Sequence, residues 1–266
     1  MDGLKMRYLW QNLLEKGFFE ELYLETINNS ENELDAFLST YAREKEDICT
    51  YVFALFLINR SKDAKYHSLA RMLLNTFFFY LPGAYFAAYS HLLAEIALSP
   101  NNITLMEYQL FYYDLPDCVV EPAEANQVSQ RILKQDPSNK IAKEVFLETQ
   151  FCKNSTAAQM CEKLPLKEKI QVLIGRGRFP QALDEVKQLS WSGLRQILVT
   201  IAHDKNICAY TFVWALLWEK ETSQLHQLAA EMFAADFTTS LYGNPVKGAD
   251  AVKGFHKRRT RELVSR

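Results

Sequence analysis

Two side chains in the first half of the chain have the types and spacing for chemistry: Arg60 and His67, seven residues apart. A histidine transfers protons near neutral pH, and an arginine holds phosphate groups. The second half has a matching histidine, His226, but carries Glu219 where Arg60 stands. A histidine that recurs without its arginine is more typical of packing than of catalysis, so we expect no enzyme activity.

The Arg–His pair also resembles the pair found in certain helical ribonucleases. The resemblance implies an alternative function, a ribonuclease in which His67 transfers a proton and Arg60 holds the phosphate. Nucleotide binding is not indicated. Residues 175–180 begin like a dinucleotide-binding glycine motif, but Pro180 occupies the place of its third glycine.

Metal and redox chemistry are not predicted either. The other histidines, His91, His203 and His256, have no spacing typical of a metal site. The five cysteines are scattered and form no CxxC motif, which indicates reduced thiols packed as small apolar residues. We therefore expect no cofactor, no metal and a cytoplasmic location.

The segments that carry these residues are duplicated. With a shift of about 160 residues, 19 of 62 positions are identical between two segments when one gap is allowed. Chance would supply about four identities at ordinary residue frequencies. The copies span about residues 11–78 and 171–237, and each is predicted to be a series of helices because its apolar residues recur at helical spacing.

A second pattern occupies the middle of the chain. Ala88 and Pro100 are twelve residues apart, and Ala125 and Pro137 repeat this spacing. A small alanine lets two helices approach, and a proline ends the pair. These residues resemble the second helix of the tetratricopeptide repeat over about residues 66–150. The resemblance implies an all-α fold, a right-handed α-solenoid of stacked helical hairpins.

Charge is uneven along the chain. Residues 243–266 carry seven Lys/Arg against two acidic residues, while residues 1–242, the expected single solenoid domain, carry a net charge of −7. An acidic body is not typical of a nucleic-acid-binding domain, so no specific nucleic acid is expected. The basic segment is predicted to be a flexible tail or a loosely docked last helix. Binding to an anionic surface is the alternative.

A membrane span is not expected. The 23 residues between Arg71 and Glu95 lack charged side chains and are long enough to cross a bilayer. Pro82 and Gly83 interrupt this stretch, however, and such a break would expose unpaired backbone to lipid. Two buried helices joined by a turn are predicted instead.

The expected solenoid indicates binding, because stacked helical repeats leave an extended concave face. If residues 102–114 form the first helix of a repeat, Tyr108, Tyr112 and Tyr113 are candidate anchors for a partner protein or peptide. The acidic body favours a basic partner. The sequence is similar in style to helical-repeat proteins of bacteria, some of which are immunity proteins that neutralise toxins. We therefore expect a non-catalytic protein–protein interaction module.

Overall fold

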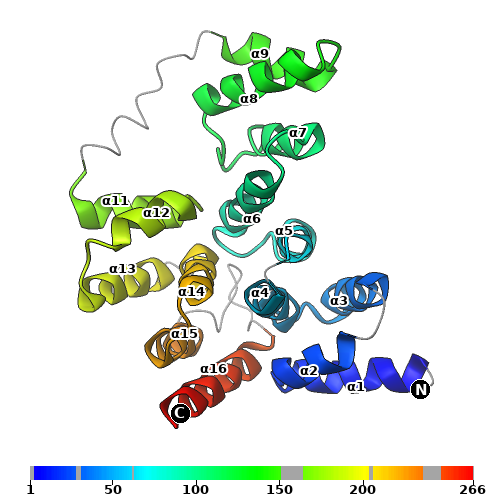
Figure 1. The fold of residues 1–266 in the computed structure, drawn as a ribbon, viewed down its shortest axis with the longest axis vertical. Coiled ribbons are helices and arrows are strands. Elements are labelled where there is room, and N and C mark those ends of the chain that lie inside the picture. Colours follow the sequence, from blue (N-terminus) through cyan, green and yellow to red (C-terminus); the bar gives the residue numbers. More distant parts are fainter. Residues whose placement is uncertain are drawn as a thin grey trace.

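The computed structural model describes residues 3–27, 31–61, 63–150, 164–203, 206–235 and 247–265. These residues form fifteen helices and no strand, which confirms the all-α class (Figure 1). The first nine helices are α1 (Gly3–Glu15), α2 (Phe19–Thr26), α3 (Glu31–Lys45), α4 (Cys49–Ser61), α5 (Lys65–Thr76), α6 (Ala84–Leu98), α7 (Ile103–Phe111), α8 (Pro122–Gln135) and α9 (Lys140–Thr149). The remaining six are α11 (Leu166–Gly175), α12 (Phe179–Val186), α13 (Trp191–His203), α14 (Ile207–Glu219), α15 (Ser223–Ala235) and α16 (Ala249–Val264).

Two series of helices have the same order: α1–α6, here the first copy, and α11–α16, the second copy. Helices α4 and α14 correspond, and both are buried along most of their length because nearly all their side chains are apolar. The correspondence extends to α6 and α16, beyond the residues that align in sequence. Each of these two helices follows a glycine with positive φ, Gly83 at 77° and Gly248 at 82°.

The last helix of each copy packs against the central helix of the other copy. Helix α6 contacts α14, α16 contacts α4, and α4 and α14 contact each other near the middle of the molecule (Figure 1). The backbone N–H of Ile207 donates to the carbonyl of Pro82 at 2.9 Å, and that of Ile48 donates to Lys247 at 3.1 Å. The two copies are therefore joined by a reciprocal exchange of contacts rather than by contacts between sequence neighbours alone.

Two glycines at equivalent turns allow this exchange. Gly17, between α1 and α2, and Gly177, between α11 and α12, have φ values of 65° and 66°. A Cβ atom on Gly17 would collide with the carbonyl oxygen of Ala251, and one on Gly177 would collide with that of Phe86. Both the backbone conformation and the close approach of a helix from the other copy thus require glycine.

Helices α7, α8 and α9 extend from α6, each packed on the one before it (Figure 1). Asparagine side chains cap two of them: Asn102 accepts from the N–H of Leu105, and Asn139 accepts from that of Ala142. An ion pair of 2.6 Å between Glu124 on α8 and Arg178 ties this group of helices to the second copy.

Residues 243–266 were expected to be a flexible tail or a loosely docked last helix, and over most of this length the flexible tail is wrong and a helix is present. Residues 249–264 form α16, whose Val252, Phe255 and His256 are buried. These side chains face α4 and α15, so the periodic apolar residues of this segment are a packing face. Residues 243–246 lie outside the described part of the chain.

The uncharged stretch between Arg71 and Glu95 is divided between α5 and α6, as predicted. In the part of the chain that the structure describes, none of the helices has the length and apolar character needed to cross a membrane.

Candidate functional site

A cavity of about 320 Å³ lies between the two copies. We call it the His67 pocket. Helices α4, α5 and α6 of the first copy and α12 and α14 of the second supply its wall. Most of its lining is apolar and includes Ala94, Phe179, Trp214, Ala215 and Trp218, and its polar side chains include Asn59, His67, Ser90 and Glu219.

A chain of hydrogen bonds runs from the pocket into the core. The Nδ1 atoms of His67 and His91 are 3.0 Å apart, and Nε2 of His91 is 3.2 Å from the hydroxyl of Tyr51. The Tyr51 hydroxyl is in turn 2.8 Å from Oγ1 of Thr211, whose own proton is donated to the carbonyl of Ile207. Four helices, α4, α5, α6 and α14, thus contribute to one chain.

The direction of this chain follows from counting protons. Since the Thr211 hydroxyl has donated its proton, it accepts from Tyr51, and Tyr51 then accepts from Nε2–H of His91. A neutral His91 has no second N–H, so its Nδ1 accepts from Nδ1–H of His67. The Nε2 atom of His67 is left as a hydrogen-bond acceptor, with no partner among the described residues.

Both histidines are neutral at physiological pH. Burial lowers the pKa of His67 to about 4. Burial also lowers the pKa of His91 well below its usual value, and the charges of His67 and Arg71 add to the effect. The pocket therefore presents neutral imidazoles to a ligand.

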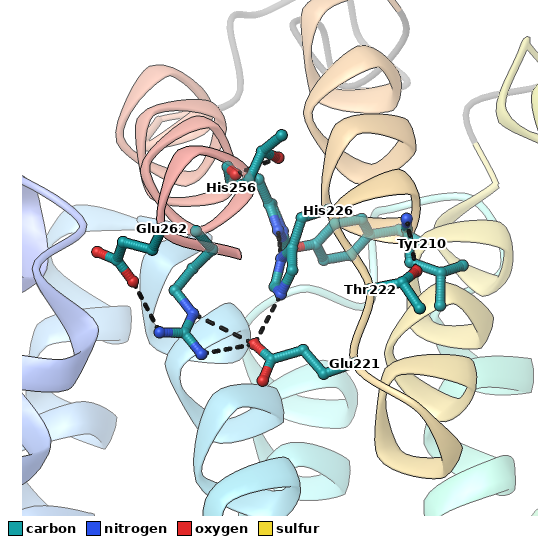
Figure 2. A network of polar contacts seen from close by, with 9 residues as sticks. Tyr210, Glu221, Thr222, His226, His256 and Glu262 are labelled. Atoms are coloured by element: carbon teal, nitrogen blue, oxygen red, sulfur yellow. Dashed lines mark hydrogen bonds and ion pairs between the residues drawn. The ribbon is translucent and has the colours of Figure 1, made fainter. Parts of the chain in front are cut away.

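The second copy contains an equivalent network, here the Glu221 cluster (Figure 2). Nδ1 of His226 is 2.8 Å from Nδ1 of His256, and Nε2 of His256 is 2.7 Å from the hydroxyl of Tyr210. Nε2 of His226 donates to the carboxylate of Glu221 at 2.9 Å. The two pairs of histidines and their tyrosines therefore have the same arrangement.

The Glu221 carboxylate is held in its charged form. It accepts from His226 and from the guanidinium of Arg259 at 2.7 Å, and Arg259 also pairs with Glu262 at 2.8 Å. The hydrogen bond from His226 is the largest cause, with Arg259 adding to it, of a pKa for Glu221 of about 2. Nε2 of His226 is thus bonded directly to a charged carboxylate, whereas Nε2 of His67 has no such partner among the described residues.

The cavity beside the Glu221 cluster has a volume of only about 90 Å³. Its small size follows from three substitutions between equivalent positions. Phe255 stands where the pocket has Ser90, Arg259 where it has Ala94, and Phe56 where it has Ala215. One member of the pair of sites is filled by its own side chains, whereas the other, with small residues, remains open.

The structure does not bring Arg60 and His67 into one site. The Arg60 guanidinium pairs with Glu20 at 2.9 Å and lines the small cavity of the Glu221 cluster. His67 lines the other pocket, where Glu219 is the counterpart of Arg60. Arg60 and His67 therefore line two different cavities.

The three candidate tyrosines have different surroundings. Tyr112 is completely buried, and its hydroxyl accepts from Asn75 at 2.7 Å, so its expected role as a partner anchor is wrong. Tyr113 is partly buried against the core. Tyr108 is 44% exposed, and the guanidinium of Arg71 lies 4.5 Å from its ring centroid.

Sequence reasoning missed His91, His256 and Glu221. The signal lay in the duplication, which matched Tyr51 with Tyr210 and His67 with His226. The two histidines of a pair are 24 residues apart in the first copy and 30 in the second. An ungapped alignment that matches His67 with His226 therefore does not match His91 with His256.

Among the described residues, no group of three His, Cys, Asp or Glu side chains could hold a metal ion. Cys49 and Cys208 are buried thiols at the starts of α4 and α14. Comparisons with protein-family models, with curated proteins and with solved structures found no match to this chain.

Proposed function

We propose that this protein is a non-catalytic binding protein that holds a small, largely apolar molecule in the His67 pocket. One observation carries the proposal: the pocket is open at about 320 Å³, whereas its equivalent in the second copy is filled by Phe255 and Arg259. A large, mostly apolar pocket with a few polar groups is typical of a ligand site.

The chemistry of the lining favours binding over catalysis. The Ser90 hydroxyl donates to the carbonyl of Ala87 at 2.6 Å, and the Thr211 hydroxyl donates to Ile207, so neither is activated as a nucleophile. His67 and His91 are bonded to each other rather than to a carboxylate. A general base oriented by an acid, as hydrolases require, is not formed by these side chains.

Direct binding of a neutral fluorescent probe tests the proposal. N-phenyl-1-naphthylamine should bind the wild-type protein with a stoichiometry of one. Replacing Ala94 by Leu extends a side chain into the pocket and should weaken binding by about tenfold or more, the result of a loss of 1.4 kcal/mol. Ala36→Leu makes the same change at an exposed position of α3 and should leave binding unchanged. Equal binding by both variants would refute the proposal.

A second candidate function is binding of a partner protein at α7. Tyr108 and Phe111, one helical turn apart, are 44% and 48% exposed, and exposed aromatic side chains are enriched at interfaces. In this candidate function, α5–α9 are stacked hairpins of a tetratricopeptide-like solenoid. The protein is cytoplasmic, and its cysteines are reduced. The acidic charge of residues 1–242 favours a basic partner, such as the toxin of an immunity pair.

Affinity capture tests the partner. Replacing both Tyr108 and Phe111 by Ala should abolish recovery of a specific basic protein. Tyr8→Ala, which removes an exposed tyrosine from α1, should leave recovery intact. Loss of the partner in both variants, or in neither, would exclude α7 as the binding surface.

A further inference from the structure

We infer that the His67 pocket takes a neutral, planar aromatic compound with one hydrogen-bond donor, and that this donor pairs with Nε2 of His67. The inference rests on the proposed function, since it names the ligand class for the same pocket. Three observations carry it: what fills the equivalent site, which side chains line the pocket, and which way the hydrogen bonds run.

The Glu221 cluster shows what kind of group fits this architecture. Its space is occupied by the ring of Phe255, which stacks on Trp214 at 6.1 Å with an interplanar angle of 8°. The centroid of the same ring lies 6.0 Å from that of His226, in an edge-to-face arrangement. Because Ser90 stands at the equivalent position in the pocket, the space of that ring is vacated there. A ligand with an aromatic ring would restore the packing that the second copy makes with its own side chain.

The lining of the pocket offers flat surfaces to such a ring. Trp218 lies 6.0 Å from His67 between ring centroids, and Phe179 and Trp214 also line the cavity. Aromatic rings gain from edge-to-face and offset-stacked contacts beyond the area that they bury. The volume of the pocket is about twice the ~150 Å³ of an engineered cavity that binds benzene. A pocket of this volume is suitable for a ligand with two fused rings.

The hydrogen-bond chain specifies a donor on the ligand. Its direction leaves Nε2 of His67 as an acceptor, whereas the equivalent atom of His226 donates to Glu221. A second polar group is compatible with a ligand hydroxyl. The amide nitrogen of Asn59, which lines both this pocket and the small cavity of the Glu221 cluster, is buried without a hydrogen-bond partner, and it would donate to a hydroxyl oxygen within reach.

Charge argues for a neutral ligand. The two imidazoles are neutral, so they do not attract an anion, and the carboxylate of Glu219 at the pocket would repel one. A buried cation would require a paired negative charge. Glu219, the carboxylate that lines the pocket, is exposed to solvent and does not provide one.

Three probes of similar shape test the inference by isothermal titration calorimetry. 2-Naphthol has the ring and the donor, 2-methoxynaphthalene has the ring without a donor, and 2-decalol has the donor on a saturated ring. 2-Naphthol should bind about five- to tenfold more tightly than either of the others. This difference is the size expected from the net hydrogen bond that 2-methoxynaphthalene lacks, and from the aromatic contacts that 2-decalol lacks.

The variant His67→Phe keeps a ring but removes the acceptor. It should bind 2-naphthol and 2-methoxynaphthalene equally, whereas His203→Phe, an exposed histidine on α13, should keep the wild-type preference. Circular dichroism verifies that each variant is folded, and the three-probe comparison in the wild-type protein stands independently of the variants.

The outcomes separate this inference from the proposed function. Tighter binding of 2-decalol than of 2-naphthol would refute the aromatic ligand, and equal binding of the two naphthalenes by the wild-type protein would refute the donor. In both cases loss of binding in Ala94→Leu would still support the pocket as a ligand site. Failure of all three probes to bind, or their undiminished binding to Ala94→Leu, would refute the proposed function itself.

Discussion

Nδ1 of His67 lies 3.0 Å from Nδ1 of His91, and the same contact recurs at 2.8 Å between His226 and His256. Two imidazole nitrogens at this distance share one proton, so at least one ring of each pair is neutral. The first pair ends at an open apolar pocket and the second at the carboxylate of Glu221. Duplicated parts of one chain thus hold the same histidine pair in two different environments.

Acid should destabilise the fold through these histidines. The pKa of His67 is about 4 in the folded protein, against about 6.5 in an unfolded chain. The unfolded state therefore binds more protons between these values, and the free energy of unfolding falls as the pH is lowered from about 6.5 to about 4. The loss from His67 alone is about 3 kcal/mol.

Urea denaturation at pH 7, 6, 5 and 4.5 measures this dependence. His67→Phe should show a shallower loss of stability over that range than the wild-type protein, while His203→Phe should match the wild type. A free energy of unfolding that does not change with pH would contradict the neutral, buried histidines.

Removal of the Glu221 carboxylate should cost more than removal of a similarly exposed carboxylate, because its partners His226 and Arg259 are 2% and 19% exposed. Glu221→Gln leaves Arg259 and His226 without their charged acceptor, and we expect a loss of about 1–3 kcal/mol. Glu231→Gln is the matched control, because Glu231 is exposed to a similar extent and also pairs with an arginine, but that arginine, Arg195, is 50% exposed. It should cost less than about 1 kcal/mol in chemical denaturation. Equal costs would indicate that the cluster adds nothing to an ordinary surface pair.

Exchange of the residues at the two equivalent positions should have opposite effects. Phe255→Ser empties a packed site and should destabilise the protein by about 3–5 kcal/mol. Ser90→Phe places a ring in the open pocket and should cost far less, while abolishing probe binding. Thermal unfolding and probe titration on the same samples measure both quantities. A Ser90→Phe protein that still bound the probe would show that the ligand sits elsewhere.

Glycine substitutions test the reciprocal packing of the copies. Gly17→Ala forces a Cβ atom against the carbonyl of Ala251 at a positive φ, and Gly177→Ala does the same against Phe86. Each should destabilise the fold by more than about 1 kcal/mol. Gly254→Ala, within α16, meets only a contact of ordinary length and should be neutral or stabilising. A neutral Gly17→Ala or Gly177→Ala would contradict the close approach of the two copies.

The sequence contained enough to predict the helices and the duplication. Helical spacing of apolar residues indicates all-α structure, and the repeated Tyr51 and Tyr210 mark equivalent buried helices. The equivalence of α6 and α16 was not predictable from that alignment, because their sequences have diverged and the second copy has a longer connection. The basic residues of α16 concealed the buried stripe formed by Val252, Phe255 and His256.

The pocket itself could not be read from the sequence, because it is formed by side chains that are small. Ser90 and Ala94 become informative only beside Phe255 and Arg259, and that comparison requires the three-dimensional equivalence of the two copies. The burial of Tyr112 was likewise hidden, since α7 ends at Phe111 and the helix expected over residues 102–114 does not continue through Tyr112. Spacing locates a residue on a helix, but tertiary packing decides which face is covered.

The most direct test of the ligand site is a crystal structure of the protein soaked with 6-bromo-2-naphthol, with the bromine located by anomalous scattering. The prediction is one bromine per chain inside the His67 pocket, with the naphthol hydroxyl within hydrogen-bond distance of Nε2 of His67, and none in the Glu221 cluster. Bromine bound outside the pocket, or a pocket that stays empty at saturating probe, would contradict a ligand site there.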